Sequence, residues 1–330
     1  MDNMKILFIT KKRSGYGCYS YGASGLAISA RFLVDMLNDS GIEAKLSEVI
    51  DNNDIDREVS RFLPDVVIIE AFWVVPEKFD ILKELHPTVR WIVRGHSDFP
   101  FLATEGVAIE WIFGYLERGV QVSFNDPRTT ASVREIAGDG VYYLPNYYPL
   151  CGSVQRREPD GFLNIGCFGA IRPLKNQLIQ AVAAIRYANE TDQNLRFYIN
   201  STRCEQGGET VLRNLRSLFG NTGYELVECR WRSHKHFLHL VRKMDVEMAV
   251  SFSETFCITA ADAVVEGVPL ICSSEVPWAS DISVVPATNA DAMVQKLDHL
   301  HPLLNHTLNH RNLRIYSKKS KKIWLDEFSE

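Results

Sequence analysis

The sequence predicts an α/β protein made of two Rossmann-like domains that face each other across a cleft. The chain has 330 residues, and at roughly 100–200 residues per domain this length favours two domains. Short apolar runs alternate with amphipathic segments, which is typical of parallel sheets covered by helices. A polar stretch at Cys151–Gly161 interrupts this alternation, and the alternation then starts again.

The first series of strands and helices precedes that polar stretch. Its six predicted strands are Lys5–Thr10, Ala44–Val49, Asp65–Glu70, Val89–Val93, Val120–Phe124 and Val141–Leu144. Asp65–Glu70 is continuous and rich in β-branched residues, as a parallel strand buried on both faces requires. Apolar residues recur at helical spacing over Leu26–Leu37, and Gly41 follows as a helix stop. Asp126 and Pro127 predict the start of another helix, as N-cap and first-turn residues.

The second series follows the polar stretch and has the same alternating pattern. Its predicted strands are Leu163–Phe168, Leu195–Asn200, Glu225–Cys229, Val246–Phe252 and Pro269–Cys272. Its predicted helices are Leu174–Ala188, Gly208–Phe219, His234–Met244, Phe256–Glu266, Ala290–Leu300 and Arg311–Phe328. We therefore expect a first domain over residues 1–150, a second over 151–310 and a separate C-terminal helix over 311–330.

Composition and charge exclude several classes of protein. The formal net charge of -5 argues against a general nucleic-acid coat protein. No apolar run approaches the roughly 18 residues that a membrane span needs, and basic residues follow the apolar N-terminal stretch, which is the wrong order for a signal peptide. The seven cysteines are odd in number and include no C-x-x-C pair. We expect a reduced, cytoplasmic protein.

The strongest functional signal lies in Met244–Trp278, where a strand, a turn and a helix succeed one another. Glu254 ends the strand, and Asp262 lies about two turns into the helix. The N–H groups at the predicted helix start between them are those of Phe256, Cys257 and Ile258. With the helix dipole they form an anion site suited to a diphosphate, and the flanking carboxylates can accept hydrogen bonds from sugar and ribose hydroxyls. The alternative is a helix with one capping acid and one solvated acid.

This segment resembles the donor-binding signature of the retaining group-1 glycosyltransferases, which have the GT-B fold. That signature places seven residues between two acids and then continues with a small-residue helix and G-x-P. Glu254 takes the first acidic position, and Asp262 stands where the family usually has glutamate. Cys257 stands where the family usually has glycine. The resemblance implies the GT-B architecture, with a C-terminal helix that crosses back to pack on the first domain.

A second signal is Ile165–Asn176 (IGCFGAIRPLKN), a strand followed by a glycine turn and a basic helix start. Lys175 and Arg172 can converge there on phosphate oxygens. The segment resembles the G-R-L-x-x-x-K element of the same family, and the spacing from Gly169 to Lys175 matches. Ala170 occupies the usual arginine position, so we expect Arg172 to substitute. The alternative is a solvated basic helix start.

Two weaker signals lie in the first domain. The loop between its first strand and helix contains Gly15 and Gly17, which allow the backbone to approach a phosphate or sugar closely, although an ordinary turn has the same composition. His96 follows the fourth strand, and the carboxyl ends of parallel strands face the ligand crevice in open α/β sheets. Family members often place a histidine there, near the transferred sugar. A structural or surface histidine is the alternative.

The segment Ser233–Leu240 (SHKHFLHL) contains three histidines, so zinc binding is one possible function of it. Because no second ligand pair has zinc-site spacing, we predict no metal site.

The resemblance implies a metal-independent retaining glycosyltransferase that uses a UDP- or GDP-sugar as co-substrate. Lys175, Arg172 and the helix start after Glu254 would stabilise the leaving diphosphate. The chain also looks like group-1 proteins of large tailed phages, so a hydroxymethylated base in phage DNA, modified in the host cytoplasm, is one predicted acceptor. The other acceptors that the sequence leaves open are a surface polysaccharide, a lipid-linked sugar and a protein. Two alternative functions remain. The protein is either a sugar-nucleotide-processing enzyme such as an epimerase, or a protein that binds a sugar nucleotide without catalysis.

Overall fold

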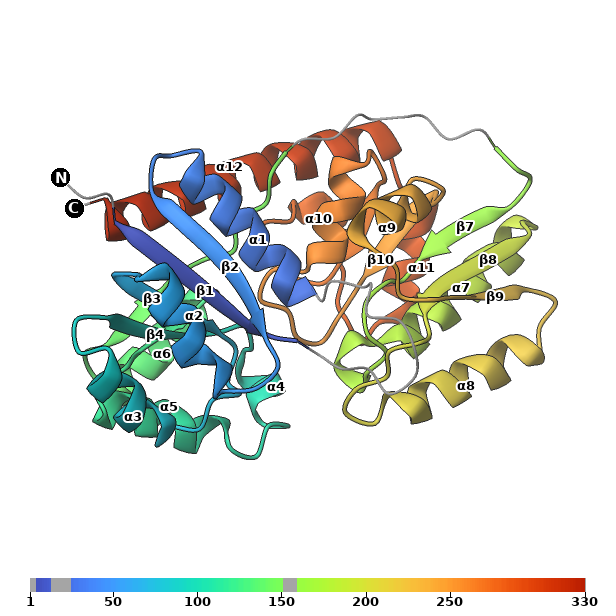
Figure 1. Ribbon diagram of the computed structural model, residues 1–330. Helices are drawn as coiled ribbons and strands as arrows, with labels where there is room; N and C mark the ends of the chain where they lie inside the picture. The colour runs from blue at the N-terminus through green and yellow to red at the C-terminus, as the bar shows by residue number, and fades with distance from the viewer. Residues whose placement is uncertain (1–3, 13–24, 151–158, 330) are drawn as a thin grey trace. The chain divides into compact units, whose positions relative to one another are not determined.

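The computed structural model describes residues 4–12, 25–150 and 159–329 (Figure 1). The chain divides into two units. The first comprises Met1–Pro149 and Tyr316–Glu330, and the second comprises Leu150–Ile315. Each unit contains a parallel sheet with helices, so the predicted α/β class is confirmed. None of the helices within the described residues is both long and apolar enough to cross a membrane.

The sheet of the first unit has six described strands, all parallel, in the order β2-β1-β3-β4-β5-β6. The strands are β1 (Lys5–Lys11), β2 (Glu43–Val49), β3 (Val66–Glu70), β4 (Arg90–Gly95), β5 (Gln121–Phe124) and β6 (Val141–Tyr143). All six predicted strands are present, and their ends lie within two residues of the predicted ends. The apolar runs were sufficient to find them because every residue of a central strand such as β3 is buried.

Helices pack on both faces of this sheet. They are α1 (Gly25–Asn38), α2 (Asp54–Phe62), α3 (Lys78–Leu85), α4 (Phe99–Leu102), α5 (Ala108–Glu117) and α6 (Pro127–Ala137). Successive residues of β1 point to opposite faces: Ile6 and Phe8 pack in the core with α1, whereas Leu7 and Ile9 pack in the core with α2, α3, α5 and α6. The predicted N-cap of α6 is confirmed, because the Asp126 carboxylate accepts a hydrogen bond from the Thr129 N–H at 2.8 Å.

The sheet of the second unit has five described strands, all parallel, in the order β11-β10-β7-β8-β9. The strands are β7 (Leu163–Gly166), β8 (Leu195–Asn200), β9 (Glu225–Cys229), β10 (Val246–Ala249) and β11 (Leu270–Cys272). The helices are α7 (Gln177–Thr191), α8 (Gly208–Gly220), α9 (His234–Val241), α10 (Ile258–Val265) and α11 (Ala290–Asp298). The strand order reverses between β7 and β10, and ligands of open α/β sheets bind outside the carboxyl ends of strands at such a point.

Two predicted helices of this unit start later than expected: α10 begins at Ile258 and not at Phe256, and α7 begins at Gln177 and not at Leu174. Residues Pro173–Lys175 form a short 3-10 turn, and α7 begins only at Gln177. Asn176 between them has a left-handed backbone, with φ of 58°. Its side-chain amide donates hydrogen bonds to the carbonyl oxygens of Val250 at 2.9 Å and Ala287 at 2.7 Å. These long-range bonds end the turn after Lys175, and no local sequence pattern announces them.

The last helix, α12 (Pro302–Phe328), begins nine residues before its predicted start at Arg311. Its early turns carry Asn305 and Asn309, which are buried although they are polar. The Asn305 side chain accepts a hydrogen bond from the Leu270 N–H and donates one to the Leu270 carbonyl oxygen, at 2.8 and 2.9 Å. The asparagine thereby continues the hydrogen bonding of β11. Residues of α12 from Tyr316 onward belong to the first unit.

Trp324 is the main anchor of α12 in the first unit. Its side chain is fully buried, and its indole N–H donates to the Pro145 carbonyl oxygen at 2.8 Å. Its ring packs against Phe8 with centroids 5.7 Å apart. The end of α12 is therefore part of the core of the first unit.

We expect Trp324→Ala to lower the free energy of unfolding of the first unit by about 3–5 kcal/mol, because it removes a large buried side chain. Urea unfolding followed by fluorescence and circular dichroism measures this loss. Ile136→Ala in α6 is the control, because Ile136 is 70% exposed and should change stability by about 0.5 kcal/mol or less. Equal losses in the two variants would contradict the anchoring role.

Candidate active site

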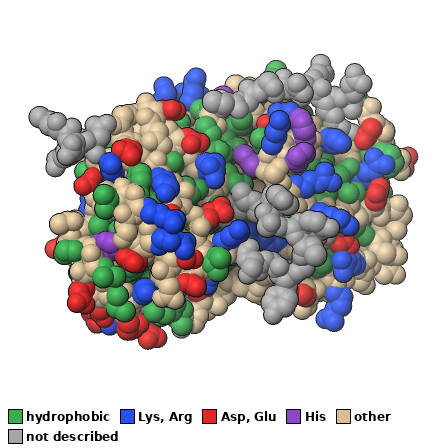
Figure 2. Space-filling model, in the orientation of Figure 1, with side chains coloured by type: hydrophobic (Ala, Val, Ile, Leu, Met, Phe, Trp, Pro, Cys, Tyr) green, Lys and Arg blue, Asp and Glu red, His purple; other side chains and the backbone are tan. Residues whose placement is uncertain are grey.

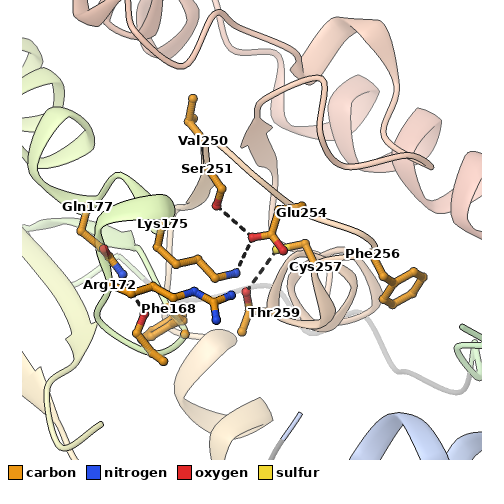
Figure 3. A network of polar contacts seen from close by, with 12 residues as sticks. Phe168, Arg172, Lys175, Gln177, Val250, Ser251, Glu254, Phe256, Cys257 and Thr259 are labelled. Atoms are coloured by element: carbon orange, nitrogen blue, oxygen red, sulfur yellow. Dashed lines mark hydrogen bonds and ion pairs between the residues drawn. The ribbon is translucent and has the colours of Figure 1, made fainter. Parts of the chain in front are cut away.

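An ion pair between Lys175 and Glu254 forms the centre of the candidate site. Lys175 follows β7, and Glu254 lies in the loop between β10 and α10. The lysine ammonium donates to the Glu254 carboxylate, and the Ser251 hydroxyl donates to the same carboxylate oxygen at 2.9 Å (Figure 3). The side chains of Lys175 and Glu254 are only 12% and 7% exposed. Two segments 79 residues apart in sequence thus meet beside the strand reversal.

The pair is ionised despite its burial. Burial alone raises the pKa of Glu254, but the charges of Lys175 and Arg172 outweigh this effect and hold the pKa below its usual range. Burial alone lowers the pKa of Lys175, and the nearby Glu254 carboxylate raises it above the ordinary value. A buried ion pair adds little net stability compared with apolar packing, and residues with shifted pKa values cluster at functional sites.

Arg172 supplies a second cation beside Lys175, as Figure 3 shows. Its Nη1 lies 3.5 Å from a Glu205 carboxylate oxygen, and the other oxygen of Glu205 accepts from Arg203 Nε at 2.8 Å. Arg172 has an extended backbone, with φ of −162° and ψ of 153°, as residues before proline prefer. Ala170 is buried, with 7% of its surface exposed. The guanidinium at this site therefore comes from position 172 and not from position 170.

The start of α10 completes the cluster. The helix begins at Ile258, and Cys257 before it has a φ of 61°, a left-handed conformation that glycine adopts most easily. The signature that the segment resembles has glycine at this position, which suits such a backbone. Burial raises the pKa of the Cys257 thiol to about 12, so the group is a neutral thiol at pH 7. The Phe256 carbonyl oxygen accepts from the indole N–H of Trp278 at 2.7 Å, which ties the loop to the following segment.

Asp262 lies on α10 and is 2% exposed. Its Oδ1 is hydrogen-bonded to Nε2 of His234, the first residue of α9, at 2.7 Å. Burial alone lowers the pKa of His234, but the bond to Asp262 and the charge of Asp262 raise it above the ordinary value. The interpretation of Asp262 as a solvated acid is therefore wrong. The interpretation of Glu254 as a helix cap is also wrong, because α10 has Cys257 at its N-cap and Glu254 bonds to Lys175.

The other predicted residues are distributed over both units. Gly169 has a φ of 115°, a backbone conformation that residues with a side chain rarely adopt, so this position requires glycine. Its N–H donates to the side-chain oxygen of Asn200 at 3.0 Å. Gly15 and Gly17 lie outside the described residues. His96 follows β4 in the first unit, where its Nε2 is hydrogen-bonded to Glu70. The assignment of ligand contacts to all of these residues stays a prediction.

The structure adds residues that the sequence did not single out. They are Glu205, which contacts Arg172, and Glu70, which contacts His96; His234, considered from the sequence only as a zinc ligand, contacts Asp262. Glu70 ends an apolar strand with a charge, and this is the one local signal that points to it.

The histidines of the zinc alternative have other partners. His234 bonds to Asp262, His236 Nδ1 lies 2.7 Å from the Ser233 hydroxyl, and His239 Nδ1 lies 3.1 Å from Arg242 Nη1. Within the described ranges, no group of three or more His, Cys, Asp or Glu residues could hold a metal ion.

The fold is shared with solved sugar-phosphate synthases. A scan of protein-family models and a search of curated proteins by sequence both give no match. The chain is similar to sucrose-phosphate synthase from Thermosynechococcus elongatus, with a TM-score of 0.71, 14% identity, and coverage of 99% of this chain and 100% of that one. It is similar to a UDP-forming α,α-trehalose-phosphate synthase from Burkholderia xenovorans, with a TM-score of 0.66, 14% identity and coverage of 98% and 97%.

A third similar structure is described as trehalose-6-phosphate from E. coli bound with UDP-2-fluoro glucose. Its TM-score is 0.67, at 10% identity and 99% coverage of both chains. At such low identities the likeness shows the fold and not the substrate. The predicted GT-B fold is confirmed over the whole chain.

We expect His234→Gln to destabilise the protein in a pH-dependent way. Because the pKa of His234 is raised, its bond to Asp262 contributes fully below the unfolded pKa of about 6.5 and is lost as the pH rises through the folded pKa. The variant should lose about 1.5–3 kcal/mol of unfolding free energy in acid, and less in alkali. Urea titrations across this pH range measure the difference. His299→Gln is the control, since its side chain is 79% exposed; a loss independent of pH would contradict a charged pair.

Proposed function

We propose that the protein is a retaining glycosyltransferase that uses a nucleotide-diphosphate sugar as donor. The observation that carries this proposal is the cluster of Lys175, Arg172 and Glu254 beside the start of α10, where two cations, a carboxylate and a helix N-terminus meet. Two cations and a helix N-terminus suit a diphosphate. The GT-B fold, shared with synthases of sugar phosphates, supports the same chemistry.

The donor would enter with its diphosphate against Lys175 and Arg172. In the transition state the bond between the anomeric carbon and the phosphate oxygen breaks, and negative charge grows on the diphosphate. Two positioned cations favour this charge more than they favour the ground state, which is how they would accelerate the reaction. Glu254 would hold hydroxyls of the transferred sugar, and Asp262, oriented by His234, would hold the ribose.

Retention of configuration follows from the resemblance to the group-1 family. The acceptor oxygen would bond to the anomeric carbon on the face that the phosphate leaves, and its proton would pass to the departing phosphate oxygen. Because the departing phosphate takes the proton of the acceptor hydroxyl, the reaction needs no separate general base. The neutral thiol of Cys257 is consistent with it, because the thiol is not ionised at pH 7 and is no nucleophile there.

A UDP-sugar is the donor we favour. One similar structure is described as UDP-forming and another as bound with UDP-2-fluoro glucose. The synthases named above make sucrose phosphate and trehalose phosphate, so a sugar phosphate is the first acceptor to test. The comparisons give no support to a phage protein or a DNA acceptor. The net charge of -5 also disfavours DNA, although three lysines of α12 are exposed, namely Lys318, Lys319 and Lys322.

The function is tested by incubating the protein with a panel of UDP- and GDP-sugars and candidate acceptors, followed by mass spectrometry. The acceptors are glucose 6-phosphate, fructose 6-phosphate, a lipid-linked sugar and DNA with hydroxymethylated bases. The expected result is UDP release coupled to a product heavier by one sugar, with the donor's anomeric configuration retained. Absence of both transfer and sugar-nucleotide binding would refute the proposal, and binding without transfer would favour the non-catalytic alternative.

We expect Lys175→Met to lower kcat/KM by a factor of about 10–100, because it removes a charge-assisted bond worth about 1.5–3 kcal/mol from the transition state. Removal of the lysine alone leaves Glu254 buried without its partner, so the variant is compared with Lys175→Met/Glu254→Gln, which removes both charges. Lys243→Met is the control, because Lys243 is exposed in the same unit. Unchanged kcat/KM in a folded Lys175→Met protein would remove the lysine from the mechanism.

Arg172 provides an independent prediction. Arg172→Ala should lower kcat/KM by about tenfold or more, since the second cation beside the diphosphate is lost. Steady-state kinetics with the best donor measure this effect. Arg213→Ala in α8 is the control, because Arg213 is exposed. An Arg172→Ala protein with full activity would show that Arg172 does not take the role of the arginine that the family signature has at position 170.

A further inference from the structure

A buried glutamine on α7 bonds to both segments that form the Lys175–Glu254 ion pair. The residue is Gln180, and it is fully buried. Its side-chain NH₂ donates to the main-chain carbonyl oxygen of Lys175 at 2.8 Å, and its side-chain oxygen accepts from the Val250 N–H at 2.9 Å. Val250 directly follows β10 and begins the segment that leads to Glu254 (Figure 3). A single amide group thus bridges the two segments.

Both backbone groups that Gln180 satisfies lie at the ends of elements. The Lys175 carbonyl belongs to the 3-10 turn that precedes α7, and Val250 lies one residue beyond the end of β10. A buried backbone N–H or C=O without a partner costs free energy. One group needs a donor and the other needs an acceptor, and a neutral side-chain amide supplies both. An apolar residue of the same length would satisfy neither group.

Two further hydrogen bonds join the same segments on either side of Lys175. The Asn176 side chain donates to the Val250 carbonyl oxygen at 2.9 Å, and the Phe252 N–H donates to the Leu174 carbonyl oxygen at 2.9 Å. Lys175 lies between Leu174 and Asn176, so its main chain is tied to the end of β10 before it, after it and at its own carbonyl. The side chain of Lys175 can therefore rotate while the main chain keeps its place.

This fixation matters because a diphosphate at the site must compete with Glu254 for the lysine ammonium. In the structure the ammonium bonds to the Glu254 carboxylate. Its transfer to a phosphate oxygen requires a change of side-chain conformation. Ordering a flexible main chain at the same time would add an entropic cost to binding. A main chain that is already fixed avoids this cost.

We propose that Gln180 is a positioning residue, which fixes the main chain of Lys175 against the end of β10 so that the ammonium moves from Glu254 to a phosphate oxygen of the donor by side-chain rotation alone. This inference rests on the proposed function, which supplies the diphosphate. Gln180 acts through Lys175, because it is fully buried and both ends of its amide bond to the backbone.

Gln180→Met tests this role, because methionine has a similar length and makes neither hydrogen bond. The probes are UDP and uridine, which differ only in the diphosphate (or GDP and guanosine, if GDP binds more tightly). The variant should bind UDP about tenfold more weakly, since the lysine is no longer held in place. Its affinity for uridine, which has no phosphate, should stay the same. Titration calorimetry with UDP and NMR titration with uridine measure the two affinities, and an unchanged ratio overturns the proposal.

A second variant shows whether the effect passes through the lysine. In a Lys175→Met background, Gln180→Met should cause no further loss of UDP affinity, because the ammonium that Gln180 positions is already gone. The same calorimetric titrations measure this. Losses that add up in the double variant would contradict the positioning role.

The matched control is Asn305→Leu. Asn305 is another fully buried amide of the second unit, and it also accepts from a backbone N–H and donates to a backbone carbonyl, both of Leu270. Leu270 lies at the amino end of β11, whereas Lys175 follows the carboxyl end of β7. Both variants should unfold at a lower temperature, but only Gln180→Met should change the ratio of UDP to uridine affinity. Equal changes of this ratio in the two variants would refute a specific role of Gln180.

Hydrogen exchange tests the bridge in the unaltered protein without any ligand. The side-chain NH₂ of Gln180 and the N–H of Val250 should exchange slowly in NMR spectra, because both are buried and bonded. Fast exchange of either group overturns the proposal, and this outcome can be read even if Gln180→Met does not fold. If the unaltered protein binds neither UDP nor GDP, the proposed function fails and this inference fails with it. If it binds UDP and Gln180→Met leaves the affinity ratio unchanged, only this inference fails.

Discussion

Parallel pairing of the strands is the constraint on which the placement of both charged clusters depends. In a parallel sheet all carboxyl ends lie at one edge, and central strands are buried on both faces. A charged side chain can therefore be placed at the strand ends without entering the apolar core. In the second unit Lys175 follows β7 and Glu254 follows β10, and in the first unit Glu70 ends β3 and His96 follows β4. Residues far apart in sequence meet there because the sheet brings the ends of their strands together.

Glu247 shows what happens to an acid inside a strand. It lies in β10 and is fully buried, and burial raises its pKa well above the usual range. Burial thus favours the neutral form of this group, whereas the acids at the strand ends, Glu254 and Glu70, are ionised beside cations. The difference lies in the partners available. At the strand ends a lysine or an arginine bonds to the carboxylate, whereas Glu247 accepts a hydrogen bond from the Phe168 N–H, and the charge of Asp262 raises its pKa further.

The strands could be predicted from the sequence because burial on both faces leaves a continuous apolar run. The short helices α2, α3 and α5 were not predicted, since they bury few residues each, as α2 buries only Ile55 and Val59. The early start of α12 was missed because its buried face carries Asn305, whose partner Leu270 is 35 residues away. Lys175, Arg172 and Glu254 were found through their resemblance to family motifs. Glu205, His234 and Glu70 were not, because their contacts join residues 26 to 33 positions apart.

The two departures from the family signature each have a structural consequence. Cys257 occupies a left-handed position that costs a residue with a side chain about 1–2 kcal/mol relative to glycine. The cost is local, and the loop is held in this conformation by Trp278, which bonds to the neighbouring Phe256 carbonyl. Asp262 is one methylene shorter than the usual glutamate, and His234 from α9 bonds to it. A histidine on a neighbouring helix thus sets the orientation of the shorter acid, so the acid's position depends on α9 as well as on α10.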